Sequence, residues 1–107
     1  MSKNIVNLTP HAVVITDGPT FDPSGKVARV DVKQADAGTI NSIPVKTQAF
    51  GDIIDLPAPT DNTIFVVSSI VLSAAKDAGR DDVVAPDTAN AVRNNDGHIV
   101  SVPGFVR

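Results

Sequence analysis

The stretch TIFVVSSIVLSAAKDAG, residues 63–79, decides the fold class, because it combines a strand and a helix in direct succession. Its first five residues are β-branched or aromatic, which predicts a central strand. Ser68 or Ser69 can then cap a helix, since apolar residues recur at helical spacing behind them. Gly79 stands where a C′ glycine ends a helix. We therefore expect one short helix at about residues 69–78, directly after a central strand.

The rest of the chain has the composition of strands and turns. All twelve acidic residues are Asp, which favours turns and caps, and valine is the commonest residue. The segment Asn-Asn-Asp-Gly at 94–97 lies between two apolar segments and predicts a C-terminal hairpin. Further strands are expected at residues 4–8, 12–16, 27–33, 43–50, 52–56 and 82–85.

These elements predict a mainly β (α+β) fold in a single domain covering residues 1–107. We expect a small antiparallel sheet with the helix packed on one face, or a compact barrel. A small open sheet leaves unpaired edges, and edge pairing or helix packing between copies would cover them. A homo-oligomer is therefore expected.

Composition narrows the classes of function. The net charge is −3, aromatic residues make up 4% of the chain, and no lysine lies within two residues of another. Binding to long nucleic acid is disfavoured, because it needs a basic stripe and stacking aromatics. Cysteine is absent, which excludes disulfides and thiolate metal sites. No signal peptide or membrane span is predicted, so a cytoplasmic protein without membrane contact is expected.

Three of the four arginines, Arg29, Arg80 and Arg93, lie in short segments rich in Ser, Gly, Asp and Pro. A guanidinium group binds phosphate or carboxylate through two hydrogen bonds at once. Backbone amides near glycine supply further donors for an anion. The arrangement predicts capture of a small anion if the three arginines converge, although ordinary polar turns have the same composition.

Two N-terminal segments offer polar groups for such a ligand. Asn7, Thr9 and His11 alternate around a proline, so they can share one face and contact a ligand, or simply form a polar strand end. Ser24 and Gly25 precede Lys26 and an arginine, which fits an anion-contacting turn or a plain hairpin turn.

Two C-terminal segments have similar alternatives. Arg80 can contact a ligand, or pair with Asp82 or Asp87, and the spacing of the aspartates does not match a known cation loop. Arg93 and His98 flank the predicted hairpin and can share a face toward a ligand or toward solvent. No catalytic triad spacing is present, and no metal site or cofactor is expected.

The chain as a whole resembles a family of small proteins encoded by bacteriophages and prophages. The resemblance rests on motifs in the same order over most of the length: NLTPH (7–11), PSGKVARV (23–30), LPAP (56–59), VVSS (66–69), DVVAPD (82–87) and VR to GHIV (92–100). The family carries no activity that transfers residue by residue. The resemblance implies a small accessory protein in the cytoplasm of an infected bacterium.

Three functions are consistent with these features. The first is binding of a small anionic, nucleotide-derived ligand without turnover, as in sequestration of an immune signal. The second is a structural or protein-interaction component of a phage. The third is a small nucleotide-directed hydrolase that uses His11 or the aspartates. Contacts to a ligand are expected from Asn7, Thr9, His11, Ser24, Gly25, Arg29, Arg80, Asp82 and Arg93.

Overall fold

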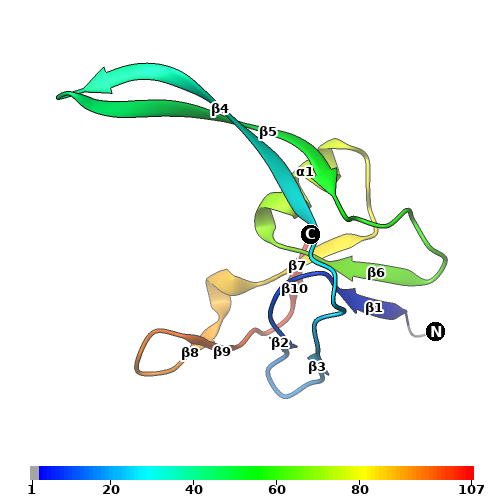
Figure 1. Cartoon of the computed structure of the whole chain (residues 1–107). Helices are drawn as coiled ribbons and strands as arrows, with labels where there is room; N and C mark the ends of the chain where they lie inside the picture. The colour runs from blue at the N-terminus through cyan, green and yellow to red at the C-terminus, as the bar shows by residue number, and fades with distance from the viewer. Residues whose placement is uncertain (1–2) are drawn as a thin grey trace.

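One long β-hairpin projects from a layered body of short strands and a single helix (Figure 1). The computed structural model describes residues 3–107, with the backbone but not the side chain of Phe50. In chain order the elements are β1 (Asn4–Asn7), β2 (Val13–Val14), β3 (Thr20–Phe21), β4 (Arg29–Ile40), β5 (Ile43–Ile54), β6 (Thr63–Val66), α1 (Ser69–Asp77), β7 (Val83–Pro86), the 3-10 turn η1 (Thr88–Asn90), β8 (Val92–Arg93), β9 (Ile99–Ser101) and β10 (Phe105–Val106).

The central sheet has the strand order β1-β6-β7-β10. All four residues of β6 are buried, which confirms the predicted central strand. Strand β6 runs parallel to both β1 and β7, and only β10 is antiparallel to its neighbour. The sheet is thus mixed rather than antiparallel, because α1 carries the chain back over the sheet between β6 and β7.

Apolar residues cover both faces of this sheet, because successive side chains of a strand point to opposite sides. On one face Phe65 and Val67 pack with Val71 and Ala75 of α1. On the other face Val66 packs with residues from β2, β7 and the segment after β9. The body therefore has two small cores, one under the helix and one under the short hairpins.

The helix forms as the sequence predicts. The hydroxyl of Ser68 accepts a hydrogen bond from the Val71 amide, which caps the N-terminus. Gly79 has a φ of +82°, and the amide of Arg80 donates to the carbonyl of Ala75 at 2.8 Å. This left-handed glycine and its following bond are typical of a helix C-terminus.

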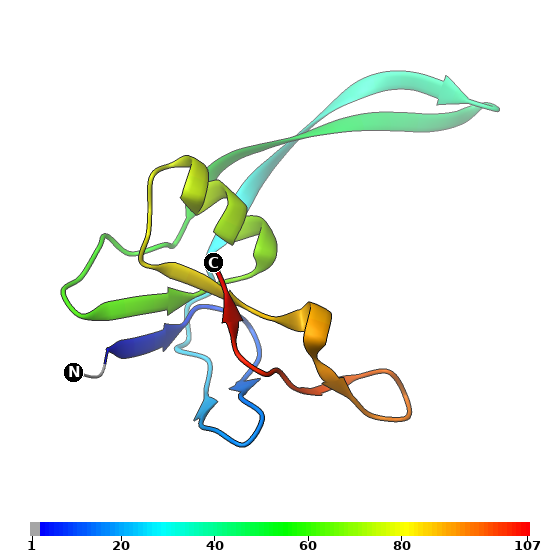
Figure 2. The same ribbon diagram turned by 180° about the vertical axis from the view of Figure 1, so that it is seen from behind.

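The remaining pairs are separate two-stranded sheets. The predicted C-terminal hairpin is present as β8 and β9, and β2 pairs with β3. In Figure 2 the projecting hairpin leaves the body at the top, and the orange β8–β9 hairpin leaves it at the bottom. Between residues 3 and 107 the strands form four small sheets and close no barrel, so the barrel alternative is not realised.

The projecting hairpin, here called the arm, consists of β4 and β5, each of twelve residues. Asn41 and Ser42 form its tip with φ of +51° and +66°, as a type I′ turn requires. The radius of gyration is 16.4 Å, whereas a compact chain of this length has about 13 Å. The arm accounts for this excess, because it leads away from the body in both views (Figures 1 and 2).

Candidate functional site

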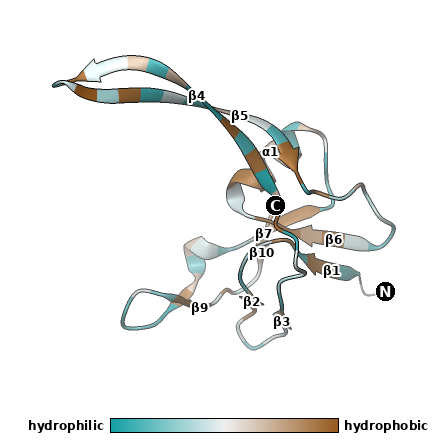
Figure 3. Ribbon diagram, in the orientation of Figure 1, coloured by the Kyte–Doolittle hydropathy of each residue, from teal (hydrophilic) through white to brown (hydrophobic). Residues whose placement is uncertain are grey.

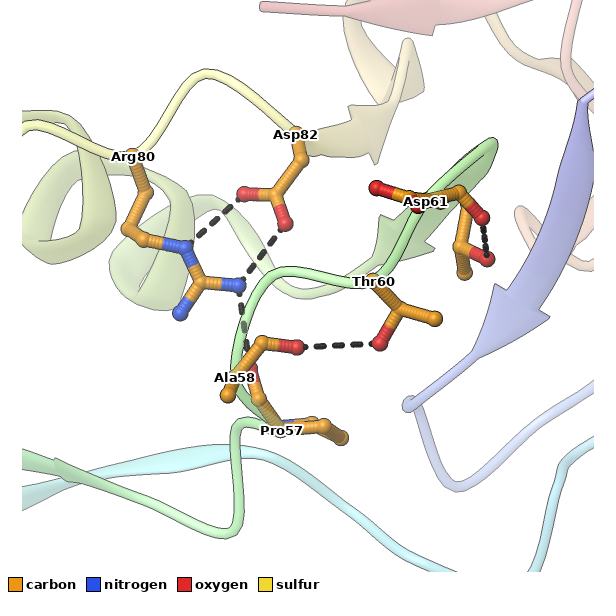
Figure 4. Close-up of polar contacts among 7 residues, drawn as sticks. Pro57, Ala58, Thr60, Asp61, Arg80 and Asp82 are labelled. Carbon is orange, nitrogen blue, oxygen red and sulfur yellow. Dashed lines mark hydrogen bonds and ion pairs between the residues drawn. The ribbon is translucent and has the colours of Figure 1, made fainter.

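Arg80 is held by its own segment of the chain. Its Nε and Nη2 donate to the two carboxylate oxygens of Asp82 at 2.9 and 2.8 Å, and Nη2 also donates to the Pro57 carbonyl at 3.0 Å (Figure 4). The two side chains are only 18% and 15% exposed. The hydrogen bond from Arg80 lowers the pKa of Asp82, and the same bond raises the pKa of Arg80. The ion pair lies within the loop after α1, and the hydrogen bond to Pro57 ties this loop to the segment before β6.

The three arginines lie on separate elements and have separate contacts. Arg93 donates from Nη1 to the Gly97 carbonyl at 2.8 Å within the β8–β9 hairpin. Arg29 is exposed at the start of β4, where it lines a groove at the base of the arm. Neither Arg80 nor Arg93 is among the residues that line this groove. The described contacts therefore give no cavity in which the three guanidinium groups meet.

Asn7 is 2% exposed and is bonded within the body. Its Nδ2 donates to the carbonyls of His11 and Phe21 at 2.9 Å each, and its Oδ1 accepts from the Thr9 amide. The Thr9 hydroxyl lies 2.6 Å from Asn7 Oδ1 and 2.8 Å from the His11 carbonyl, so it can donate to either. These bonds fix the turn around Pro10, which is the structural role that the sequence also allowed.

Thr9 and His11 do share one surface feature. They line a cleft of about 380 Å³ that passes the N-terminus of α1 and the strands β2 and β9. Apolar side chains such as Val100 and Val102 make up much of its wall, and hydroxyl groups of Ser68 and Ser69 lie at its edge. This cleft brings together two of the predicted ligand residues, whereas it contains none of the predicted arginines.

Ser24 and Gly25 form an exposed turn before the arm. Gly25 has a φ of +99°, a conformation that L side chains rarely adopt. The Ser24 hydroxyl lies 3.5 Å from the Lys26 amide, at the outer limit of a hydrogen bond. His98 is placed by a different turn, in which Asn94 Oδ1 accepts from the amides of Asp96 and His98 at 3.0 Å each.

The arm is the feature that the sequence interpretation missed. The sequence predicts strands at residues 27–33 and 43–50 but no element at residues 34–42. The available signal was the pair Asn41-Ser42 between Ile40 and Ile43, flanked by segments of equal length. Asn-Ser is weaker than Asn-Gly as a type I′ turn signal, and Gly38 also interrupts the pattern of the first strand.

The register gives the arm two different faces. On one face Gln34 pairs with Gln48, and Asp36 forms an exposed ion pair with Lys46 at 2.6 Å. On the other face the cross-strand pairs are Lys33 with Ala49, Ala35 with Thr47, and Ile40 with Ile43. This second face, defined by these six residues and called the apolar face below, carries one charge. Figure 3 shows hydrophobic colour recurring along the arm as far as its tip.

Most of the arm does not contact the body. From residue 31 to 49 every residue is exposed except Val45, which is half-buried. Ile40 and Ile43 at the tip are each 64% exposed. A two-stranded hairpin alone is marginally stable in water, and stability normally requires a third strand or a packed face. The arm therefore combines an exposed apolar face with two strand edges that no other strand of residues 3–107 covers.

A groove of about 300 Å³ lies where the arm joins the body. Leu8 and Val71 of the core line it, while Val27, Val32 and Ile70 at its rim are 41%, 46% and 54% exposed. This arm-base groove is thus a second apolar surface, about one arm's length from the tip.

Comparisons with known proteins give no assignment. No family model matches the chain, and neither a curated protein nor a solved structure matches it. Among residues 3–107 no helix is long and apolar enough to cross a bilayer. Within the same part of the chain, no three His or Asp side chains are grouped so that they could hold a metal ion. The arm, the arm-base groove and the cleft are therefore the features that can indicate a function.

Proposed function

We propose that this protein is a structural or interaction component that binds another protein surface through its arm. The single observation that carries this proposal is the exposed apolar face of a hairpin whose strands are twelve residues long. Val30 and Ile53 at the base of the hairpin pack against the core. Its outer part adds nothing to the core, because the apolar side chains there remain in water. Contact with a partner would bury them and would also cover the unpaired strand edges.

The charge of the arm favours a protein partner over a nucleic acid or an anionic membrane. Across β4 and β5 there are three basic residues, Arg29, Lys33 and Lys46, and three acidic ones. Such a balance supplies no field for a polyanion. Mixed charges around an apolar centre are, in contrast, normal for protein interfaces. The setting that we propose, an infected bacterial cytoplasm, rests on the phage-family resemblance alone.

The test expresses the wild-type chain, or the double tip variant Ile40→Asp/Ile43→Asp, in cells of the organism that encodes the protein. Complexes are then cross-linked in these cells and purified with the chain as bait. We expect the tip variant to lose the complexes that the wild type forms, because aspartates oppose burial of the tip. The matched control is Val92→Asp, which places a charge on an apolar side chain that is 48% exposed in the β8–β9 hairpin. Identical complexes from the wild type and the tip variant would contradict the proposal.

A second function, binding of a small anionic and nucleotide-derived ligand without turnover, is favoured by one observation. Thr9 and His11 line the 380 Å³ cleft together with three serines, and the cleft has no acidic side chain in its lining. Titration calorimetry with cyclic dinucleotides and ADP-ribose derivatives tests this function. Binding should weaken in His11→Ala and persist in His98→Ala, because His98 is not among the cleft residues. Absence of heat with every compound would contradict it.

The same panel distinguishes sequestration from hydrolysis. If the cleft were an active site, product would appear from at least one nucleotide, and His11→Ala would abolish it because His11 supplies the acid or base there. Binding with unchanged nucleotide over hours would favour sequestration.

A further inference from the structure

We propose that the partner of the arm is a second copy of this chain, and that the tip of each arm enters the arm-base groove of the other copy. This inference rests on the proposed function of the arm and identifies its partner. Two copies related by a two-fold axis would lay their arms antiparallel. Each tip then lies over the base of the other arm, because the two arms have the same length.

Both halves of this contact are apolar and exposed. The tip offers Ile40 and Ile43, and the rim of the groove offers Val27, Val32 and Ile70. These five are half of the ten large apolar residues that are exposed in the described part of the chain. One chain carries both the projecting apolar tip and an apolar groove. A two-fold arrangement therefore covers both at once and closes after two copies.

The contact area also favours a reciprocal arrangement. A hairpin of twelve-residue strands is about 40 Å long and about 10 Å wide, so one face presents about 400 Å². Contact along one face would bury about 800 Å² over both partners, which is less than the roughly 1,000 Å² of a specific interface. In the reciprocal dimer, groove residues outside the two strands of the arm, such as Val27 and Ile70, supply the remainder.

Charge does not oppose this association. The chain carries a net charge of −3, but basic and acidic residues are equal in number across β4 and β5. The excess negative charge therefore lies in the body. Two arms can meet without net repulsion, and the antiparallel arrangement keeps the two bodies at opposite ends of the arms.

Cross-linking through introduced cysteines tests the contact directly, because the chain contains no cysteine of its own. We expect Ile43→Cys protein mixed with Ile70→Cys protein to form a disulfide-linked heterodimer, with a mass tag on one partner to identify it. The matched control is Ile43→Cys mixed with Val92→Cys, which should give no heterodimer above the background of random collision. Equal yields from the two mixtures would overturn the proposal.

The molecular mass in solution provides a second test. Light scattering after size exclusion should give a dimer for the wild type and for Val92→Asp. Ile43→Asp and Ile70→Asp should each raise the dimer dissociation constant by at least about tenfold, since each places a charge in the apolar contact. A monomer at all concentrations, or open-ended aggregates, would overturn the inference. Arm-dependent complexes with other proteins would, in that case, still support the proposed function.

Discussion

In the body, Val66 and Val67 are fully buried, whereas Ile40 and Ile43 at the tip of the arm are each 64% exposed. Both regions contain β-branched residues, although these are denser in β6 than in β4. The difference lies in what covers each strand: a helix and short hairpins cover the central sheet, and nothing in the described chain covers the outer arm. The body therefore holds the buried apolar contacts of the chain, whereas the arm presents exposed apolar surface.

The substitution that we expect to destabilise the protein most lies in the core of the body. Leu8→Ala removes a side chain that is 2% exposed and packs under the helix. We expect the free energy of unfolding to fall by about 2–5 kcal/mol, because the lost contacts leave a cavity. Urea denaturation measures this value.

The control for Leu8→Ala is Ile43→Ala, measured at protein concentrations too low for self-association. Its side chain is exposed at the tip, so the free energy of unfolding should change by no more than about 0.5 kcal/mol. A comparable loss in both variants would show that the arm contributes to the folding of the body, which contradicts the division between the two regions.

A smaller effect is expected at the ion pair between Arg80 and Asp82. Asp82→Asn removes the carboxylate that accepts two hydrogen bonds from the guanidinium group, and we expect a loss of about 1–3 kcal/mol at neutral pH. The matched control is Asp81→Asn, since Asp81 is exposed and its substitution should change stability by no more than about 0.5 kcal/mol.

This ion pair also predicts a pH dependence. The pKa of Asp82 in the folded protein lies below its ordinary value of 3.8, because Arg80 stabilises the carboxylate. The stabilisation is therefore fully present above that ordinary value and is lost as the pH falls through the lower, folded-state pKa. The difference in unfolding free energy between wild type and Asp82→Asn should shrink over that acidic range. A difference that stays constant between pH 6 and pH 2 would contradict the assignment.

The fold of the body could largely be predicted from the sequence, because its signals are local. The β-branched run before Ser68 and the glycine at position 79 placed β6 and α1, and Asp96-Gly97 placed the last hairpin. The parallel pairing of β1 with β6 could not be predicted, because it joins strands that are more than fifty residues apart. Strand order depends on which apolar faces meet, and many pairings satisfy the same pattern.

The candidate site was harder to predict, because the same residue types serve structure and binding. The sequence allows Arg80 either to pair with Asp82 or to contact a ligand. In the structure Arg80 forms the ion pair with Asp82. Asn7 is a predicted ligand residue, but its side-chain amide donates its hydrogen bonds to carbonyl groups of the body. The arm escaped prediction because its apolar residues are dispersed among charged ones, and exposure cannot be derived from spacing alone.

The smallest change in stability is expected from a substitution in the turn at the tip of the arm. Ser42 has a φ of +66°, which is unfavourable for a residue with a side chain, and a type I′ turn favours glycine at this position. Ser42→Gly should therefore stabilise the hairpin by about 0.5–1 kcal/mol, which slows amide exchange of arm residues by about two- to fivefold. Gly38→Ala should have the opposite sign, because Gly38 has a φ of +86°. Exchange in β6 and β7 should stay unchanged in both variants, since these strands belong to the body. If amides of the body change together with those of the arm, the two regions unfold as one unit, and the arm is not an independent contact element.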